Sequence, residues 1–514
     1  MEKVFEIMNE KNLHYLIVGF IFSIFSIARL NMIISIYIWP FCFLTYLHKN
    51  ESKVIPLVIV SLCLVVSSVI RWIGCSHVNF LADLVLGIYL SLINIIPFVI
   101  DDIFYNKISK WKSVLIFPLS VAFIEFAFSF WPFANNNVYA YAHRENIQYL
   151  QIISVFGCYF LSFIIALFSS ILDYSLDLYK NENRISKFIF IYCTIIIIIY
   201  FFGLIRLLIP IEKGSINIAA SIGVSQSLYE NKDESGGVLN ISFYIDYMNE
   251  TMKRASDSKA QIMTYAEEAF FIFLEDNQTI IDSASEFARN YSIFALIALD
   301  VYHNETYSSN EAVLISDEGE VLYNYQKQHL IPLVEKGYYE DMKELKSIDT
   351  KYGKLTVVIC YDINFPFFLN SLSRDHFDLL LVPSWDWDGI AEWHSNEVRY
   401  RAIEGGFNVL KNTANGIIIS SDYKGRSLSY HITQDFEDYH VISNVNNKGV
   451  KTIYSYIGSF FNFLYLIALI FIIIFDKIKG CLNKENKENK ENESSSSMKM
   501  LSEMSAGNQE NEDD

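Results

Sequence analysis

Eight long apolar stretches limit what this chain can fold into. Each supplies roughly 17–22 residues, about the length of helix that crosses a hydrocarbon layer of ~30 Å. The sequence is 52% hydrophobic and only 19% charged, which is too apolar for an ordinary soluble enzyme. We therefore expect a polytopic α-helical membrane protein with about eight transmembrane helices. The stretches lie near Leu13–Ala28, Met32–Leu47, Val54–Ile70, Phe80–Ile100, Ser113–Phe133, Tyr149–Leu172, Phe188–Ile209 and Ile457–Phe475.

Basic residues in the short loops predict how the chain is oriented. The N-terminus and the even-numbered loops hold ten of them and the odd-numbered loops hold three, and the side richer in Lys and Arg is normally the cytoplasmic one. We expect a multi-pass protein of the cell membrane with both termini in the cytoplasm and its polar segment outside. The ten are Lys3, Lys11, Lys49, Lys53, Lys107, Lys110, Lys112, Lys180, Arg184 and Lys187, and the three are Arg29, Arg71 and Arg144.

The same pattern divides the chain into four parts. Residues 1–212 are expected to form a seven-helix transmembrane domain, residues 213–452 a polar domain, and residues 453–478 a C-terminal transmembrane helix. Residues 479–514 repeat Asn, Lys and Glu and offer no apolar face, so we expect a disordered cytoplasmic tail.

Short β-branched runs alternate with helical patterns in the polar segment. This interleaving is typical of a layered α/β domain. Strands are expected at Ile216–Ile222, Gln261–Tyr265, Ser292–Leu299, Ala312–Ser316, Val321–Tyr325, Leu355–Cys360, Leu379–Pro383, Val409–Asn412 and Ile417–Ser421. Helices are expected at Ser242–Ala255, Gln278–Asn290, Pro366–Arg374 and Glu392–Glu404.

Charge and cysteine content exclude several functions. The net charge is −18, and residues 214–450 hold 35 acids against 18 bases, which argues against a nucleic-acid partner. Seven cysteines scattered over 514 residues do not make a disulfide scaffold. His329 and His394 lack a sequence cluster with metal-ligand spacing, and no nucleotide-binding motif occurs, so we expect neither a metal nor a cofactor.

Cys360 is the candidate nucleophile. It follows the apolar run that ends at Ile359, and active sites of α/β domains form where buried strands end. The alternative is a small buried hydrophobic residue, which is the more common role for an arbitrary cysteine. A catalytic role is favoured because an outer domain normally pairs its cysteines, whereas Cys360 has no partner in the polar segment.

Two further side chains follow predicted strands and fit a reactive thiol. Glu267 could accept the thiol proton, and Lys327 could stabilise the thiolate and then an oxyanion. A thiol needs such help because its pKa of about 8.5 leaves little thiolate near pH 7. Taken singly, Glu267 reads as a solvated loop acid and Lys327 as an ordinary surface lysine.

In this order Glu267, Lys327 and Cys360 resemble the Glu–Lys–Cys triad of the nitrilase, or carbon–nitrogen hydrolase, superfamily. The run from Lys327 to Pro332 followed by Glu335 is similar to the lysine motif of the apolipoprotein N-acyltransferase family, as is the run Cys360-Tyr361-Asp362. Two later segments resemble that family too, and they read Arg401-Ala402-Ile403-Glu404 and Thr413-Ala414-Asn415-Gly416. The resemblance implies a nitrilase-like αββα sandwich inserted, outside the membrane, between seven helices and one.

The resemblance also implies a reaction. Cys360 would take an acyl chain from a membrane phospholipid as a thioester and pass it to the N-terminal diacylglyceryl-cysteine of a lipoprotein. Glu267 would act as general base and acid, while Lys327 and Glu335 would stabilise the tetrahedral intermediate with support from Tyr361 and Asp362. Both substrates are anchored in the membrane by acyl chains, which suits a membrane enzyme. We expect this enzyme to act as a monomer.

Departures from the family pattern leave two alternatives open. Tyr265-Ala266-Glu267 replaces Trp-Pro-Glu, Asp362 replaces a glutamate, and the run from Pro383 to Gly389 reads PSWDWDG where the family has a Ser-Asn-Asp-Ala-Trp-Phe-Gly pattern. The protein could instead be a membrane-tethered amidase, in which water resolves the thioester. It could also be a degenerate nitrilase fold that serves as an extracytoplasmic binding module.

Overall fold

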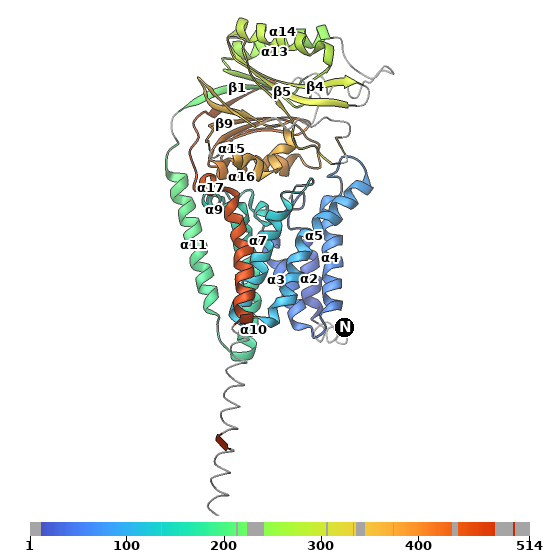
Figure 1. Ribbon diagram of the computed structural model, residues 1–514, viewed down its shortest axis with the longest axis vertical. Helices are drawn as coiled ribbons and strands as arrows, with labels where there is room; N and C mark the ends of the chain where they lie inside the picture. Colours follow the sequence, from blue (N-terminus) through green and yellow to red (C-terminus); the bar gives the residue numbers. More distant parts are fainter. Residues whose placement is uncertain are drawn as a thin grey trace, which may run out of the picture.

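The computed structural model consists of a helical part and an α/β part stacked along one axis (Figure 1). It describes residues 12–134, 136–211, 214–223, 241–304, 307–332, 334–335, 345–373, 375–433, 440–478 and 497–498. The expected tail, residues 479–514, lies outside the described residues except for 497 and 498.

Six helices in the described residues are long and apolar enough to cross a membrane: Val54–Trp72, Phe80–Lys107, Trp111–Phe128, Cys158–Glu182, Lys187–Leu208 and Phe460–Ile478. Within these spans lie α4 (Val54–Trp72), α5 (Phe80–Phe104), α7 (Ile116–Phe128), α10 (Cys158–Glu182) and α11 (Lys187–Leu208). The apolar composition of the chain therefore did predict helices that could span a membrane, although six rather than eight of those in the described residues meet this measure.

The first two expected spans form shorter helices. Leu13–Ile24 (α2) has 12 residues and Ser35–Lys49 (α3) has 15, which is less than a single helix needs to cross ~30 Å. The expected span at Tyr149–Leu172 is also interrupted. Gly157, with φ of 77°, separates α9 (Ile153–Phe156) from α10, because its left-handed backbone cannot continue a helix.

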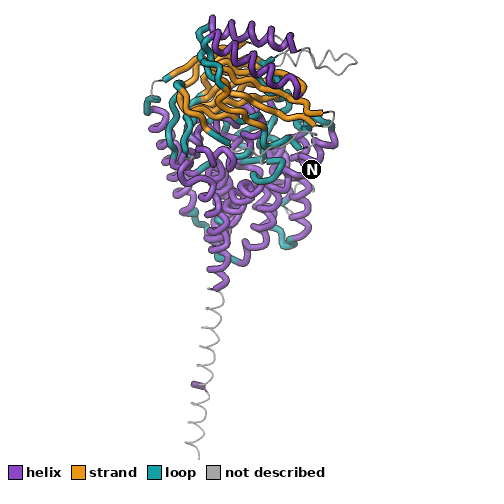
Figure 2. Tube along the Cα trace, turned by 45° about the horizontal axis from the view of Figure 1, so that its top comes forward, coloured by secondary structure: helices purple, strands orange, loops and turns teal. Residues whose placement is uncertain are grey.

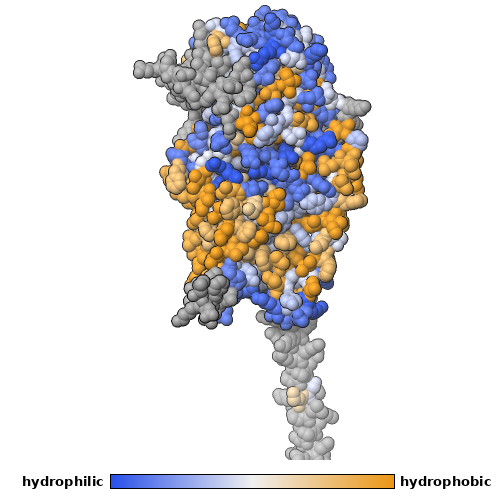
Figure 3. All heavy atoms as spheres, turned by 180° about the vertical axis from the view of Figure 1, so that it is seen from behind, coloured by the Kyte–Doolittle hydropathy of each residue, from blue (hydrophilic) through white to orange (hydrophobic). Residues whose placement is uncertain are grey.

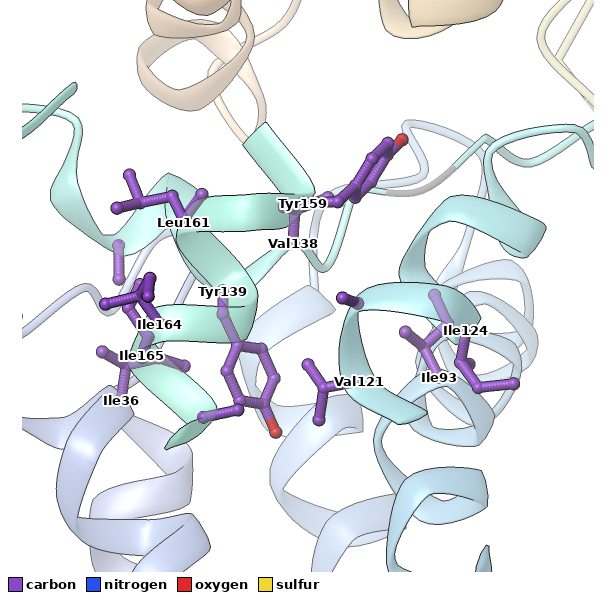
Figure 4. Close-up of a cluster of buried hydrophobic side chains, with 14 of the residues drawn as sticks. Ile36, Ile93, Val121, Ile124, Val138, Tyr139, Tyr159, Leu161, Ile164 and Ile165 are labelled. Carbon is purple, nitrogen blue, oxygen red and sulfur yellow. The ribbon is translucent and has the colours of Figure 1, made fainter. Parts of the chain in front are cut away.

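The helical part has its own apolar core, in which α3, α5, α7 and α10 meet. Figure 4 shows side chains of these helices pointing toward one another around Tyr139, which lies in the short 3₁₀ segment Tyr139–His143. The labelled residues are Ile36, Ile93, Val121, Ile124, Val138, Tyr139, Tyr159, Leu161, Ile164 and Ile165. Seen from behind, the helical part has a largely apolar surface and the α/β part a mostly polar one (Figure 3).

Two β-sheets form the centre of the α/β part (Figure 2). The first has the order β13-β1-β2-β4-β5-β6 with β3 paired to β4, and the second has the order β12-β11-β10-β9-β8-β7. The first sheet comprises β1 (Ser215–Ser221), β2 (Ile262–Tyr265), β3 (Phe270–Phe273), β4 (Phe294–Asn304), β5 (Tyr307–Ile315), β6 (Val321–Gln326) and β13 (His440–Asn446). The second comprises β7 (Ser347–Thr350), β8 (Gly353–Val357), β9 (Leu379–Trp385), β10 (Asn408–Ala414), β11 (Ile417–Ser421) and β12 (Ser427–Ile432).

Helices cover both outer faces of this pair of sheets, which completes an αββα sandwich (Figure 1). The first sheet is covered by α13 (Ile241–Asp257) and α14 (Asn277–Tyr291), and the second by α15 (Pro366–Ser373) and α16 (Ala391–Gly405). Strand β9 is buried along almost its whole length, which explains why its residues 379–382 read as a continuous apolar run rather than an alternating one. The predicted α/β layering is therefore confirmed.

Helix α16 joins the two parts of the molecule. It lies between the second sheet and the membrane helices, and Tyr400 and Ile403 belong to the core of the helical part. The hydroxyl of Tyr400 donates a hydrogen bond of 3.0 Å to the carbonyl of Ala140. The α/β part is thus packed directly on the helices.

Candidate active site

Cys360 lies at a sharp turn after β8. The expected strand Leu355–Cys360 is shorter in the structure: β8 ends at Val357, and Cys360 opens the 3₁₀ segment Cys360–Asn364. Its φ of 44° falls in the left-handed region, which costs a residue with a side chain about 1–2 kcal/mol. The thiol is buried and its Sγ lies 3.7 Å from the carbonyl oxygen of Trp385. Such strain is concentrated at functional sites, which fits a positioned nucleophile.

Glu267 lies just beyond the end of β2 and is buried. Its Oε1 accepts hydrogen bonds from Lys327 Nζ at 2.7 Å and from Asn310 Nδ2 at 2.8 Å. Its Oε2 accepts the backbone N–H of Trp385 at 2.8 Å. Glu267 and Cys360 therefore both contact the backbone of Trp385, one through the amide and the other through the carbonyl.

Lys327 follows β6 and is fully buried between two carboxylates. Its ammonium lies 2.7 Å from Glu267 and 2.5 Å from Glu335, whose other oxygen accepts the backbone N–H of Ile331 at 2.5 Å. Burial tends to lower the pKa of Lys327, but Glu267 and Glu335 raise it well above its usual value, so the lysine stays charged. A fixed cation is suited to stabilising an oxyanion.

The electrostatics keep the nucleophile protonated at rest. Burial raises the pKa of the Cys360 thiol well above its ordinary value, and the charge of Glu267 adds to this effect while Lys327 opposes it. The thiol therefore needs a base at the moment of attack. Glu267 is the candidate base, and hydrogen bonds from Lys327 and Asn310 fix its orientation.

The structure brings Glu335 into this cluster, whereas Tyr361 and Asp362 form their hydrogen bonds with other groups. Tyr361 donates a hydrogen bond of 3.2 Å to the carbonyl of Pro132 in the helical part. Asp362 lies behind the nucleophile, where its Oδ2 accepts the backbone N–H of Ile359 at 3.1 Å. Tyr361 thus binds the helical part, and Asp362 binds the backbone next to the nucleophile.

A small pocket opens beside Cys360, and both parts of the molecule line it. The loop after α4 and the start of α5 provide one wall, with Val78, Ala82 and Leu86 among its apolar side chains. No Lys, Arg, Asp or Glu lines it in the described residues. The full set is Trp72, Cys75, Ser76, Val78, Ala82, Leu86, Phe133, Asn136, Ile331, Pro332, Val334, Cys360, Tyr361, Asn364, Trp387, Ile390, Trp393 and His394.

Sequence reasoning missed a second group of buried charges beside the thiol. One ligand atom each of Cys360, Asp386 and His394 lies within 4.8 Å of the other two, so the sequence argument that His394 lacks such neighbours does not hold in the folded chain. Lys411 lies 2.5 Å from Asp386 and already compensates its charge. The carboxylates of Glu267, Glu268 and Glu335 are equally close to one another, with the Lys327 ammonium bound to two of them.

Only one signal in the sequence pointed to this second group. The run from Pro383 to Gly389 puts two aspartates and two tryptophans where an active-site segment of the family lies. Lys411 and His394 belong to β10 and α16, and nothing in their local sequence indicates that they meet there.

Comparison with known proteins identifies the α/β part. Residues 220–445 match the family model of the carbon–nitrogen hydrolases. This segment is a carbon–nitrogen hydrolase domain. The resemblance inferred from Glu267, Lys327 and Cys360 is therefore confirmed at the level of the family, and the matched segment contains all three.

The relatives of this hydrolase domain carry different names. The chain is 27% identical over 183 residues to apolipoprotein N-acyltransferase 1 of Treponema denticola, covering 30% of this chain and 34% of that protein. It is 26% identical over 174 residues to deaminated glutathione amidase of Dictyostelium discoideum, covering 31% of this chain and 57% of that protein. An amidase from Nesterenkonia sp. AN1 superimposes with a TM-score of 0.40 at 18% identity, covering 46% of this chain and 93% of that one. The chain thus spans about a third to just over half of these two curated relatives.

Proposed function

We propose that this protein is an N-acyltransferase of the cell membrane. It takes a fatty acyl chain from a membrane phospholipid as a thioester on Cys360 and transfers it to the α-amine of a diacylglyceryl-cysteine at the N-terminus of a lipoprotein. The observation that carries the proposal is the pocket beside Cys360, which is apolar and lined in part by residues that adjoin the membrane helices. The named N-acyltransferase relative supports the same reading.

The pocket suits an acyl chain better than a small polar substrate. Val78 lines it and is 45% exposed, and the neighbouring Phe80 and Leu81 are exposed as well, so its wall continues into the apolar surface of α5. Burying a chain there gains about 0.8 kcal/mol per CH₂ group. Burial of its acyl chain therefore favours binding of a lipid ester in front of the thiol, whereas a small amide gains no such stabilisation.

The first half-reaction acylates the enzyme. Glu267 accepts the proton of the Cys360 thiol as Sγ attacks the ester carbonyl carbon, and Lys327 stabilises the oxyanion that forms. The ester C–O bond then breaks, Glu267 returns the proton to the departing oxygen, and a lysophospholipid leaves. The acyl chain remains on Cys360 as a thioester.

The second half-reaction transfers the acyl chain. The neutral α-amine of the acceptor attacks the thioester carbonyl carbon, and Glu267 accepts the proton that the amine loses. The C–S bond breaks, the amide product leaves, and Sγ recovers its proton from Glu267. In this proposal the hydrolase domain faces the outer side of the membrane, as the distribution of basic residues predicts.

Labelling with a phospholipid that carries an alkyne-tagged fatty acid tests the proposal. Wild-type protein in lipid nanodiscs should acquire the tag, and mass spectrometry should locate it on Cys360. Cys360→Ala should reduce labelling at least 100-fold. Cys193→Ala is the matched control, since Cys193 is an exposed residue on α11 outside the pocket, and it should label as wild type does. Labelling of Cys360→Ala at the wild-type level would remove the proposal.

The amidase relative supports a second candidate, a membrane-tethered carbon–nitrogen hydrolase that acts on a small amide. Adding a diacylated lipopeptide to the acyl-enzyme separates the two, because acyl transfer yields a triacylated peptide and hydrolysis yields free fatty acid. Leu86→Trp narrows the pocket and should slow transfer from a long-chain donor at least tenfold. A small-amide hydrolase should tolerate that change. Absence of any thiol reactivity at Cys360 would instead favour a binding module.

A further inference from the structure

Strand β12 carries an exposed apolar face at the edge of the second sheet. Leu428, Tyr430 and Ile432 alternate along the strand, so they lie on the same face, and their exposed fractions are 43%, 48% and 52%. Their neighbours across the pairing with β11 are buried: Ile419 lies opposite Tyr430, and Ile417 lies opposite Ile432. Helix α16 packs on β10 and β11 and leaves this face of β12 uncovered in the described part of the chain.

A cavity larger than the pocket of Cys360 lies against this face, and we call it the β12 groove. Strand β12, the start of α16 and the loop after α2 all contribute to it, so both parts of the molecule line the groove. The residues used below are Ala28, Arg29, Glu392, Trp393, Tyr430 and Ile432.

Arg144 connects two of the elements that line the β12 groove. Its Nη2 lies 2.6 Å from Glu392 Oε1 at the start of α16, and its Nη1 donates a hydrogen bond of 3.2 Å to the carbonyl oxygen of Ala28. The Arg144 side chain is itself mostly buried. The loop after α2 and the start of α16 are therefore held together, which favours binding because little of the site has to become ordered when a ligand enters.

The β12 groove adjoins the pocket of the nucleophile. Trp393 lines both spaces, and the next residue, His394, belongs to the group beside the Cys360 thiol. One face of this indole ring therefore belongs to the groove and another part of the same side chain to the thiol pocket. A ligand seated in the groove comes within about the width of Trp393 of the space in front of Cys360.

The lining of the β12 groove is mixed in polarity. Arg29 and Glu392 supply charges of both signs and Tyr430 supplies a hydroxyl group, beside the apolar side chain of Ile432. Polypeptide has the same mixture of amides, charges and apolar side chains, whereas an acyl chain would have to desolvate the charged groups without replacing their hydrogen bonds. The groove therefore suits a polypeptide better than a lipid tail.

The loop after α2 also carries exposed apolar residues next to the groove. Leu30, Met32 and Ile33 follow Arg29 directly and are all exposed. A ligand in the groove thus lies between an apolar surface of the helical part and the polar surface of the hydrolase domain. This combination fits a molecule that has acyl chains at one end and polypeptide at the other.

We propose that the β12 groove binds the polypeptide segment that follows the diacylglyceryl-cysteine of the acceptor. The diacylglyceryl chains remain in the membrane, the α-amine of the cysteine approaches the thioester on Cys360 beside Trp393, and the next residues of the acceptor occupy the groove. This inference rests on the proposed acyl transfer and adds the site at which the second substrate is recognised.

Separate measurement of the two half-reactions in nanodiscs tests the proposal. The double variant Tyr430→Ser, Ile432→Ser removes two side chains that are half exposed, so it should fold. Acyl-Cys360 should form from a tagged phospholipid within about twofold of the wild-type rate, while the lipopeptide concentration for half-maximal transfer should rise about tenfold. Leu428→Ser is the matched control, because Leu428 lies on the same face of β12 but outside the groove, and it should behave as wild type does.

A diacylated lipopeptide with a photoreactive residue shortly after its cysteine provides a second measurement, in the wild-type chain. It should cross-link to the peptides that contain Tyr430 or Trp393, and unlabelled lipopeptide should suppress this product whereas phospholipid should not. Cross-links confined to other parts of the chain would overturn the proposal.

An unchanged half-maximal lipopeptide concentration in the double variant also overturns the proposal. So does a slower formation of acyl-Cys360 with unchanged transfer, since the groove would then serve the phospholipid donor. If the double variant does not fold, cross-linking of the wild-type chain decides. If the wild-type chain forms no acyl-Cys360, the proposed acyl transfer fails by itself, and cross-linking still decides whether the groove binds the polypeptide.

Discussion

Asp362 Oδ2 accepts a hydrogen bond of 2.6 Å from the hydroxyl of Tyr325, and this contact ties the two sides of the active site together. The same oxygen accepts the N–H of Ile359, next to the nucleophile, while Oδ1 accepts the N–H of His329 at 2.9 Å. Tyr325 belongs to β6, and Lys327 follows directly after this strand. One buried carboxylate therefore sets the distance between the strand that precedes the lysine and the turn with the thiol.

Asp362→Asn should loosen this connection without changing the size of the side chain. Replacing a buried charged acceptor leaves its donors poorly satisfied, which costs about 1–3 kcal/mol of unfolding free energy. Acyl transfer should fall at least tenfold, because Cys360 and Lys327 lose their common support. Thermal unfolding and lipid labelling measure the two effects. Asp349→Asn, at an exposed position on β7, should change neither, and an equal response of both variants would contradict the bridging role.

Lys327→Met should be among the most damaging single changes in the hydrolase domain. It leaves the carboxylates of Glu267 and Glu335 buried without their cation, and breaking a buried ion pair in this way costs about 3–5 kcal/mol. Lys351→Met removes a solvent-exposed pair with Asp317 and should cost less than about 1 kcal/mol. Chemical denaturation of both variants provides the comparison. Similar losses of unfolding free energy in the two variants would mean that the buried ion pairs contribute little to stability.

Glu268→Gln should change how stability depends on pH. Burial raises the pKa of Glu268 well above its ordinary value, and Asp300 and Glu267 raise it further. Above the pKa of about 4.3 that a glutamate has in an unfolded chain, the folded protein holds a proton that the unfolded chain has released, so unfolding free energy falls as pH rises toward the folded pKa. Glutamine resembles the protonated form and removes this slope.

Melting temperatures between pH 5 and pH 8 test that expectation. Glu268→Gln should gain stability relative to wild type as pH rises, with the largest gain at pH 8. The exposed Glu275→Gln should follow the wild-type curve. A constant difference between Glu268→Gln and wild type across this range would contradict the raised pKa of Glu268.

Gly389→Ala should disturb the contact between the two parts of the molecule. A Cβ at Gly389 would lie 2.0 Å from the carbonyl oxygen of Gly74, in the loop after α4, so the chain must shift. This loop also lines the pocket, and we expect lipid labelling to fall at least tenfold while iodoacetamide still alkylates Cys360 within threefold of the wild-type rate. Gly214→Ala is the control, since its nearest contact is the movable side-chain oxygen of Asn447. Normal lipid labelling of Gly389→Ala would show that the contact does not shape the pocket.

Much of the α/β part could be predicted because its strands are strongly apolar. The expected run Leu379–Pro383 lies within β9, and the expected helix Glu392–Glu404 lies within α16. Strands β3, β7, β12 and β13 were missed. Two of them are polar or exposed and owe their conformation to pairing, and β13 is held by β1 from more than 200 residues away. Local pattern carries no information about such partners.

The amino-acid sequence alone determined the apolar spans, the alternation of strands and helices, and the places where Glu267, Lys327 and Cys360 follow strands, because each depends on neighbours along the chain. Only the tertiary structure decided that Asp386, His394 and Lys411 meet beside the thiol, that Asp362 connects the two sides of the site, and that the membrane helices supply a wall of the pocket. These features depend on contacts between residues that are up to 300 or so positions apart, as between Cys75 and Gly389. The packing of α16 against both the second sheet and the helical part creates them, and no local sequence pattern encodes that packing.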